Sequence, residues 1–209
     1  MYTPRNPATL PIKFVDIETT GLDPYKHEII EIAVVPLDDN EPFWQTRIKP
    51  QRIEDASPKA LEVNGYDKHP ELWDNAPPIE QVAPVIRAQL AGCLPAGHNV
   101  GFDLGFVKKY LKDFDLFHGI TYHQVDTVTL AIEHLAPCGL DRVRLEDVCN
   151  FLGISNQGAH SALTDALRAK EVYKRLVRST PVDRLQWWAT NKVEHFFSAI
   201  LDLVSPANK

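Results

Sequence analysis

The chain has little of what marks secreted, membrane or disulfide-stapled proteins. It contains three cysteines, far apart and with no Cys-x-x-Cys pair, which predicts reduced thiols in a cytoplasmic protein. No apolar run approaches the roughly 20 residues of a membrane span, and residues 1–11 lack an apolar signal-peptide core. We find no internal repeat and no low-complexity segment. These absences favour a cytoplasmic globular protein.

Positive charge is also scarce. The 22 Lys and Arg residues are outnumbered by 28 Asp and Glu residues, for a formal net charge of −6. Proteins that coat nucleic acid need many Lys and Arg contacts to phosphate, so this class is disfavoured. An enzyme that grips a few terminal nucleotides stays open, because bound metal ions can supply positive charge locally.

What is present is an ordinary globular composition. The 209 residues, 44% hydrophobic and 24% charged, suit one domain with its own core and an appendage. We divide the chain into an N-terminal tail (1–11), a main domain (12–178) and a C-terminal helical extension (179–209).

The order of elements predicts a mixed-sheet α/β domain. Three apolar strands with short links, at 12–18, 29–35 and 43–48, suggest an antiparallel meander. Strands and helices then alternate. The expected strands are 94–96 and 121–125, and the expected helices are 78–90 (with Pro84 as a possible kink), 102–111, 127–135, 144–152, 162–177 and much of 181–204.

Asp16 and Glu18 end the first predicted strand, just before the turn Thr19-Thr20-Gly21. Residues two apart on a strand share a face, so the two carboxylates repel unless a cation neutralises them. Hard oxygen ligands suit Mg²⁺ or Mn²⁺ better than zinc. Alone the pair is a weak signal, since Asp39-Asn40-Glu41 has the same spacing in a turn and a solvated strand end is an equally good interpretation.

Asn99 and Asp103 form a second constellation. Asn99 is placed to cap a helix that starts near Gly101, with Asp103 in its first turn, where the helix dipole favours a carboxylate. Capping and dipole compensation are a purely structural alternative to a functional role.

His160 and Asp165 form the third group of candidate site residues. Five residues apart on one helix, they would face about 140° apart, so they converge only if His160 lies on a loop and Asp165 in the first turns. Ser161 is a plausible helix cap. The spacing is common, since His98 and Asp103 repeat it.

Order and context together carry more information than any one motif. A strand with Asp-x-Glu-Thr-Thr-Gly, then Asn-x-x-Phe-Asp opening a helix, then His-x4-Asp opening a later helix resembles the DEDDh, or DnaQ-like, 3′→5′ exonuclease family. That family includes polymerase III epsilon-type proofreading exonucleases, RNase T and oligoribonuclease. The resemblance runs from about Phe14 to Leu176, with no departure at its five central positions. Lesser family features also stand in place at 29–32, 60–65, 125–127, 145–148 and 152–154.

The resemblance implies an RNase H-like mixed five-stranded sheet flanked by helices, and a two-metal hydrolysis that releases nucleoside 5′-monophosphates. Two divalent ions can activate water, relieve phosphate charge and stabilise the leaving oxygen, and a histidine can accept a proton near neutral pH. Asp16 would be shared between the ions. The implied ligands of two Mg²⁺ (or Mn²⁺) ions are Asp16, Glu18, Asp103 and Asp165, and the implied general base is His160.

The same resemblance implies how a nucleic acid 3′ end is held. Thr19 and Leu22 would line the pocket of the terminal nucleotide, with Leu22 wedged against a base. Phe102 would contact the sugar or base, or simply pack, and Asn99 would fix the loop before Asp103. Single-stranded ends fit most easily, since unpaired bases can splay and stack.

Three functions compete. The first is a DNA exonuclease in proofreading or repair, which we favour because Asp-Ile-Glu-Thr-Thr-Gly-Leu resembles the proofreading branch. The second is an exoribonuclease, which differs in contacts to the 2′-hydroxyl that the sequence does not locate. The third is a non-catalytic nucleic-acid-binding module, which the filled reactive positions disfavour although fold alone would not settle it.

The C-terminal extension has an apolar stripe. We favour packing of this stripe on its own domain, the usual use of such a face. The alternative is a docking surface for a polymerase or for a second copy of the chain. Its residues are Leu185, Trp187, Trp188, Phe196, Phe197, Ala199, Ile200 and Leu203.

Overall fold

The computed structural model describes residues 6–158 and 160–190. It divides into two compact units. The first comprises Met1–Thr127 with Gln157–Lys170, and the second comprises Val128–Asn156 with Glu171–Lys209. Within the described residues, no helix combines the length and the apolar character that a membrane crossing requires.

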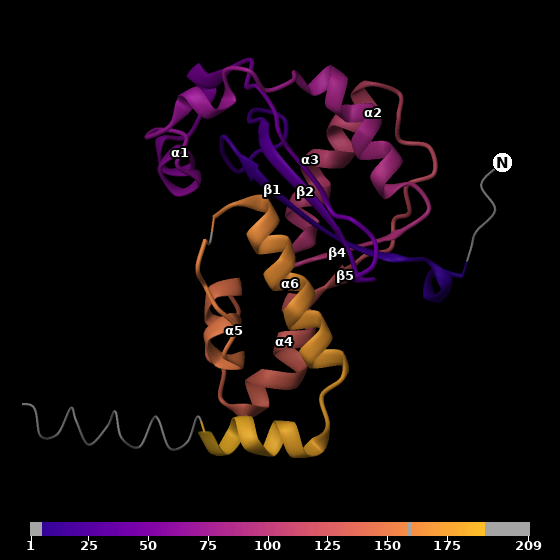
Figure 1. The fold of residues 1–209 in the computed structure, drawn as a ribbon, viewed down its shortest axis with the longest axis vertical. Coiled ribbons are helices and arrows are strands. Elements are labelled where there is room, and N and C mark those ends of the chain that lie inside the picture. Colours follow the sequence, from indigo (N-terminus) through magenta and orange to yellow (C-terminus); the bar gives the residue numbers. More distant parts are fainter. Residues whose placement is uncertain (1–5, 159, 191–209) are drawn as a thin grey trace, which may run out of the picture. The chain divides into compact units, whose positions relative to one another are not determined.

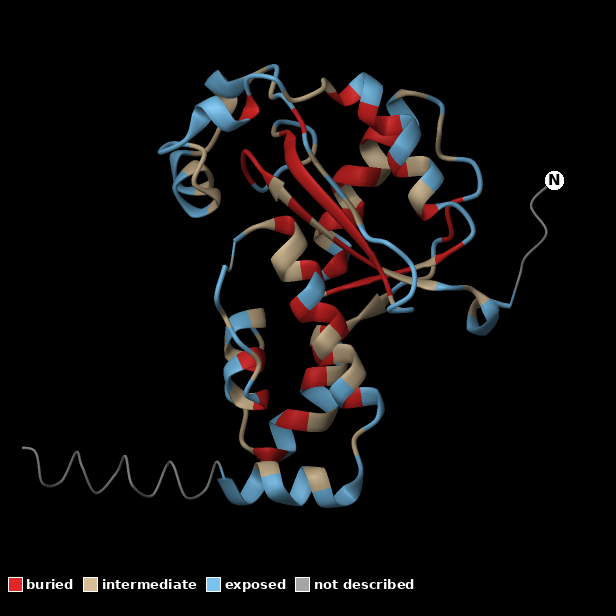
Figure 2. Cartoon of the chain, in the orientation of Figure 1, coloured by how far each residue is buried: buried red, intermediate tan, exposed pale blue. Residues whose placement is uncertain are grey.

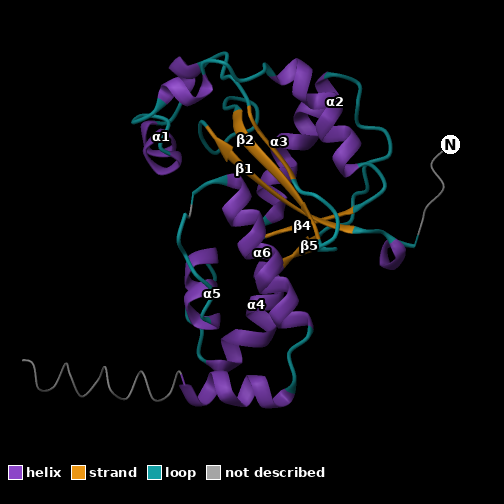
Figure 3. Ribbon diagram, in the orientation of Figure 1, coloured by secondary structure: helices purple, strands orange, loops and turns teal. Residues whose placement is uncertain are grey.

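The first unit is built on a five-stranded mixed sheet in the order β3-β2-β1-β4-β5 (Figures 1 and 3). β1 pairs antiparallel with β2, and β2 with β3, whereas β4 runs parallel to both β1 and β5. This confirms the predicted meander followed by parallel strands. The strands are β1 Ile12–Thr19, β2 Ile29–Pro36, β3 Trp44–Arg47, β4 Leu94–Gly97 and β5 Val125–Asp126.

β2 lies between β1 and β3 and is buried along its whole length (Figure 2). Its β-branched residues suit a central strand that is covered on both faces. β1 sends Val15 and Ile17 into a core that they share with Ile32 and Val34 of β2. Because side chains alternate along a strand, Asp16 and Glu18 point to the opposite face.

Helices α2 and α3 supply much of that core through side chains such as Val82, Ile86, Phe106 and Val107. Pro84 lies inside α2, on an exposed position, and the helix continues through it. The helices of this unit are α1 Pro58–Asn64, α2 Ile79–Leu90, α3 Val100–Asp113 and the first half of α6 Ala162–Val177, with 3₁₀ turns at Pro7–Thr9, Ile53–Asp55 and Pro70–Trp73.

The structure corrects the predicted elements in two places. The strand expected at 121–125 is reduced to the two residues of β5, because the Thr121 hydroxyl accepts the His123 N–H at 3.1 Å and turns the chain there. Helix α1, seven residues long, was not expected. None of its residues is buried, so no apolar stripe facing the core marks it in the sequence.

The second unit is helical. Its core contains residues of α4, α5 and the second half of α6, among them Leu135, Val148 and Val172, and Trp187 packs against it. Residues 181–190 are helical, as predicted, while Val182, Leu185 and Trp188 are exposed. The rest of the predicted stripe, from 191, lies outside the described residues. The remaining bounds are α4 Thr127–Leu135, α5 Leu145–Leu152 and a 3₁₀ turn at Ala136–Cys138.

Candidate active site

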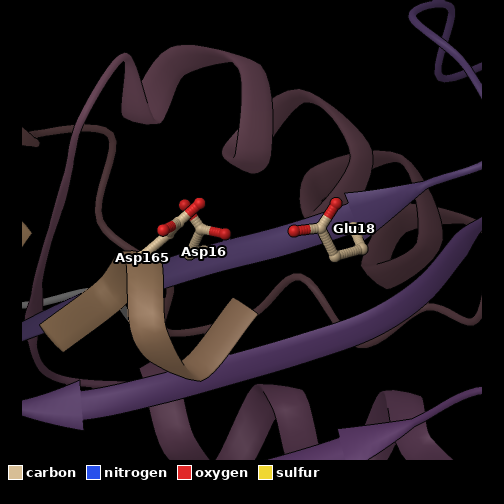
Figure 4. Close-up of side chains that lie close together, drawn as sticks. All are labelled: Asp16, Glu18 and Asp165. Atoms are coloured by element: carbon tan, nitrogen blue, oxygen red, sulfur yellow. The ribbon is translucent and has the colours of Figure 1, made fainter. Parts of the chain in front are cut away.

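Three carboxylates meet on the face of β1 that points away from the α2–α3 core. Asp16 and Glu18 project from the same face of β1, and Asp165 approaches from the first turn of α6 (Figure 4). Each offers an oxygen, and these oxygens all lie within 4.8 Å of one another. The sequence predicted this convergence of residues almost 150 positions apart.

Asp103 reaches the site from the edge of the same strand. β4 pairs with β1 only as far as Phe14 and ends at Gly97, so the β1 edge beyond is open. There the buried Asp103 accepts the Ile17 N–H through Oδ1 at 3.1 Å. Asp103 is outside the set of oxygens within 4.8 Å, but its charge is among those that act on Asp16.

Asn99 holds the turn before Asp103 through its backbone. It occupies the N-cap position of α3, but in the left-handed conformation (φ 62°) and with no hydrogen bond from its side chain to the helix. The predicted side-chain cap is therefore wrong, because capping side chains normally come from an extended backbone. The Asn99 N–H instead donates to Asp126 Oδ1 at 3.0 Å, and the helix starts at Val100.

His160 lies on the loop before α6, as the convergence with Asp165 required. It is exposed and left-handed (φ 68°), and its N–H donates to Asp165 Oδ2 at 3.3 Å. Ser161 caps the helix as predicted, with Oγ accepting the Thr164 N–H at 3.4 Å. The imidazole is outside the cluster of three carboxylates.

The electrostatics of the carboxylate cluster favour bound cations. Burial first, and then the charges of Asp165, Glu31 and Asp103, raise the pKa of Glu18 to about 8. Burial first, then the neighbouring carboxylates, lifts the pKa of Asp16 well above its usual range. Burial also raises the pKa of Asp103. Hard, crowded oxygen donors that resist ionisation fit a divalent metal ion, which would restore their charged forms.

Arg168 is a site residue that the sequence reasoning missed. Its guanidinium donates to Asp165 Oδ1 at 2.7 Å, and the side chain is buried, at 6% exposure. The signal was available, because residues three apart on a helix are neighbours and Arg168 follows Asp165 at that spacing.

A mainly apolar pocket of about 330 Å³ adjoins Glu18. Thr19 lines it, with Oγ1 donating to the Gly21 carbonyl at 2.7 Å. Leu22 stands at its side with 81% exposure, and Phe102 lines it while packing on Phe106 at 5.2 Å between ring centroids. Thus three of the four predicted substrate contacts line one pocket, and Asn99 does not. The full lining is Ile17, Glu18, Thr19, Gly21, Leu22, Ser57, Lys59, Ala60, Val63, Asn64 and Phe102.

The far wall of this pocket comes from α1 and the residue before it, which the sequence reasoning did not assign to the site. Asn64 joins this wall to β1, since its Nδ2 donates to the Thr19 carbonyl at 3.0 Å. The Ser57 N–H likewise donates to the Thr20 carbonyl at 2.7 Å. A wall assembled by tertiary contacts leaves no local pattern in the sequence.

A mixed β3-β2-β1-β4-β5 sheet with clustered carboxylates at its central strand defines the class, an RNase H-like nuclease fold. The chain belongs to the exonuclease family, because the RNase_T family model, described as "Exonuclease", matches residues 14–173. The resemblance to DnaQ-like 3′→5′ exonucleases is thereby confirmed.

The chain is similar to proteins of DNA polymerase III and to ribonuclease T. The PolC-type DNA polymerase III of Thermotoga petrophila is 32% identical over 167 residues, which cover 78% of this chain but only 12% of that protein. Ribonuclease T of a Shewanella species (strain W3-18-1) is 30% identical over 184 residues and is covered over 79% of its length. The epsilon subunit of DNA polymerase III from Aquifex aeolicus is 25% identical, with 78% of both chains covered.

Solved structures agree on the fold. A structure of exonuclease I superposes with a TM-score of 0.69 at 20% identity, covering 91% of this chain and 46% of that one. A zinc-bound complex of E. coli exonuclease I with single-stranded DNA gives the same TM-score, with 92% and 45% covered. At this identity the likeness speaks for the fold alone.

Proposed function

We propose that this chain is a metal-dependent 3′→5′ exonuclease that hydrolyses phosphodiester bonds from the 3′ end of single-stranded DNA and releases nucleoside 5′-monophosphates. The observation that carries the proposal is the meeting of Asp16, Glu18 and Asp165 oxygens within 4.8 Å of one another, in a chain of the exonuclease family.

Asp16, Glu18, Asp103 and Asp165 would hold two Mg²⁺ or Mn²⁺ ions, with Asp16 as the shared ligand. Such ions supply charge relief for the phosphate and a lowered pKa for water. The raised pKa values of Asp16 and Glu18 support this assignment, because a cation removes the repulsion that raises them.

His160 is the proposed general base. Its support is that His160 lies exposed on the loop before α6 and that its backbone N–H donates to Asp165 Oδ2 at 3.3 Å. It would accept the proton of the attacking water, a role that suits a histidine near neutral pH.

The pocket beside Glu18 is the proposed seat of the 3′-terminal nucleotide. Leu22 would wedge against a base, since most of its side chain is available for contact. Thr19 and Phe102 also line the pocket. A terminal nucleotide seated beside the carboxylates explains cleavage at an end rather than within a strand, and an unpaired end enters most readily.

DNA is the favoured substrate, because the relatives include a PolC-type DNA polymerase III and the epsilon subunit of a DNA polymerase III. An exoribonuclease is the second candidate. Its support is the match to ribonuclease T, which extends over most of that protein. The two activities differ in how the site treats the sugar 2′-hydroxyl.

We further propose that residues 12–178 form the exonuclease domain, that 179–209 form an extension and that the protein works in the cytoplasm, where its three unbridged thiols would stay reduced. A polymerase or a second copy of the chain is the proposed protein partner. The exposed Val182, Leu185 and Trp188 support such a contact.

The test is degradation of end-labelled oligonucleotides. Purified protein is incubated with single- and double-stranded DNA and with RNA, each with Mg²⁺, Mn²⁺ or EDTA. We expect metal-dependent shortening from the 3′ end, fastest on single-stranded DNA. It should be at least about 100-fold slower in His160→Ala, the scale of lost acid–base catalysis, and in Asp16→Asn, which removes a charged metal ligand. Asp38→Asn and His118→Ala, which lie outside the cluster, are the matched controls.

The outcomes separate the candidates. Faster shortening of RNA than of DNA would favour the exoribonuclease. Retarded but intact oligonucleotide in every metal would favour a binding module and overturn the enzyme proposal.

A further inference from the structure

Glu31 is a fifth carboxylate beside the site, and the proposed function gives it no role. It lies on β2 opposite Glu18 of β1 and opposite Arg47 of β3. Directly opposed residues of antiparallel strands point to the same face, so Glu31 shares the face of the carboxylate cluster. It is buried at 9% exposure, and a buried charge is costly unless it is paired and hydrogen-bonded.

Both oxygens of Glu31 are engaged by protein groups. Oε1 accepts the N–H of Ala162 at 3.0 Å, and Oε2 lies 3.6 Å from Arg47 Nε. Arg47 is itself placed over the Trp73 ring, 5.0 Å from its centroid. Glu31 is outside the set of oxygens that can share an ion, so its contacts are those of a tether rather than of a ligand.

The tether ends at the residue that starts α6. Ala162 is fully buried and is the first residue of the helix, and the Ser161 hydroxyl satisfies the Thr164 N–H one turn on. The first N–H groups of a helix have no partner inside it, so a carboxylate there both satisfies a donor and meets the positive end of the helix dipole. Asp165 lies three residues after Ala162, in the same first turn.

We propose that Glu31 is a positioning residue that anchors the start of α6 to the sheet and so sets Asp165 against Asp16 and Glu18. The anchor also fixes the near end of the loop that carries His160. This inference rests on the proposed function, because it assigns Glu31 to the same metal site. Groups that orient metal ligands from behind typically contribute 10- to 100-fold in metal affinity.

Two variants separate the contribution of the length of the Glu31 side chain from that of its charge. Glu31→Asp keeps the charge that faces Arg47 but is one methylene too short for the Ala162 N–H. Glu31→Gln keeps an oxygen that can accept that N–H but removes the charge. A positioning role predicts damage from Glu31→Asp, and a role as metal ligand predicts damage from Glu31→Gln.

Glu28 provides the matched control. It is buried at 5% exposure, accepts the backbone N–H groups of Gln51 and Arg52 at 2.8–3.2 Å, and has the Arg52 Nε at 3.9 Å. It thus repeats the chemistry of Glu31 without touching α6. Glu28→Asp measures what the loss of such a tether does to the fold in general.

The experiment measures Mn²⁺ binding to the full chain by calorimetry without nucleic acid, and amide exchange of the 160–166 segment in EDTA. We expect Glu31→Asp to bind Mn²⁺ at least about tenfold more weakly and to exchange faster at 160–166, with Glu31→Gln and Glu28→Asp within about threefold of the parent. Unchanged Mn²⁺ affinity and exchange in Glu31→Asp would overturn the inference, as would a loss confined to Glu31→Gln.

A failure of the proposed function can be distinguished from a failure of the Glu31 anchor. If the parent chain binds no Mn²⁺, the metal site is wrong, and the exchange measurement in EDTA still decides whether Glu31 anchors α6. If all variants bind Mn²⁺ alike and exchange alike at 160–166, the anchor falls, and if the parent also shortens no oligonucleotide, the enzyme assignment falls with it.

Discussion

Glu18 carries a carboxyl group whose pKa is raised to about 8, chiefly by burial and then by the neighbouring acids. A protonated Glu18 is a poor ligand for a cation, so metal binding and proton release are coupled at this residue. The site is thus built with more negative charge than the chain alone can hold at neutral pH.

The raised pKa predicts how stability responds to pH. An unfolded Glu titrates near 4.5 and the folded Glu18 near 8, so between these values the folded state binds more protons. The free energy of unfolding of the metal-free chain should therefore fall as pH rises from about 4.5 to about 8. Urea unfolding in EDTA across this range checks it.

Glu18→Gln should flatten that pH dependence, with Asp16 and Asp103 keeping the rest of it. Saturating Mn²⁺ at pH 8 should raise the stability of the parent more than that of the variant. If the metal-free parent instead gained stability between pH 4.5 and 8, the interpretation that these acids are buried with no compensating positive charge would be wrong.

Arg168 makes a second residue-scale prediction. Its pair with the half-buried Asp165 supplies positive charge beside the cluster. Arg168→Met should lower the free energy of unfolding in EDTA by about 2 kcal/mol, because a half-buried carboxylate loses its charged hydrogen-bond partner. Mn²⁺ should restore part of the loss by taking over the positive charge. The paired measurement is urea unfolding with EDTA or Mn²⁺, and equal losses in both would argue that Arg168 has no link to the metal site.

At the scale of elements, the site depends on where β4 stops. β4 covers the edge of β1 only to Phe14, and Gly97 at its end lies so close to β1 that an added Cβ would meet the Val15 carbonyl oxygen at 2.8 Å. Asp103 can reach the Ile17 N–H only because β1 is uncovered beyond this point. The ending of one strand thus creates the position of one proposed ligand.

Gly97→Ala should destabilise the chain by about 2 kcal/mol, since backbone and Val100 would both have to move. Gly105→Ala is the control, because a Cβ there meets nothing within 4 Å and the residue lies inside α3. That substitution should stabilise by about 1 kcal/mol through helix propensity. Thermal unfolding of both variants is the measurement, and a neutral Gly97→Ala would show that β4 and β1 can separate at this point without cost.

The net charge of the whole molecule is −6. The proposed binding site holds only the 3′ end of one strand. Few phosphates are then neutralised by Lys or Arg. The logarithm of the affinity for single-stranded DNA should fall with the logarithm of salt concentration with a slope of about −2, as for two or three phosphate contacts. Fluorescence anisotropy with Ca²⁺ in place of Mg²⁺ measures it, and a slope steeper than about −6 would reveal a long basic track instead.

The elements of the chain were largely predictable from its sequence, because burial imposes a period on the hydrophobic residues. The strand 29–35, the helix 127–135 and the helix 162–177 match the observed bounds to within a residue. The strand expected at 121–125 was mostly wrong and α1 was missed, since a side-chain hydrogen bond ended the first and tertiary contacts, not an apolar stripe, hold the second.

The local order of Asp16, Glu18, Asp103, His160 and Asp165 was enough to indicate the family, because each residue sits at the end of an element whose type the sequence reveals. Tertiary structure alone decided that Glu31 meets the start of α6 and that α1 closes the pocket beside Glu18. Periodicity reports which side of an element faces the core. It does not report which partner from another element will lie across the gap, since that depends on distances that only the folded chain sets.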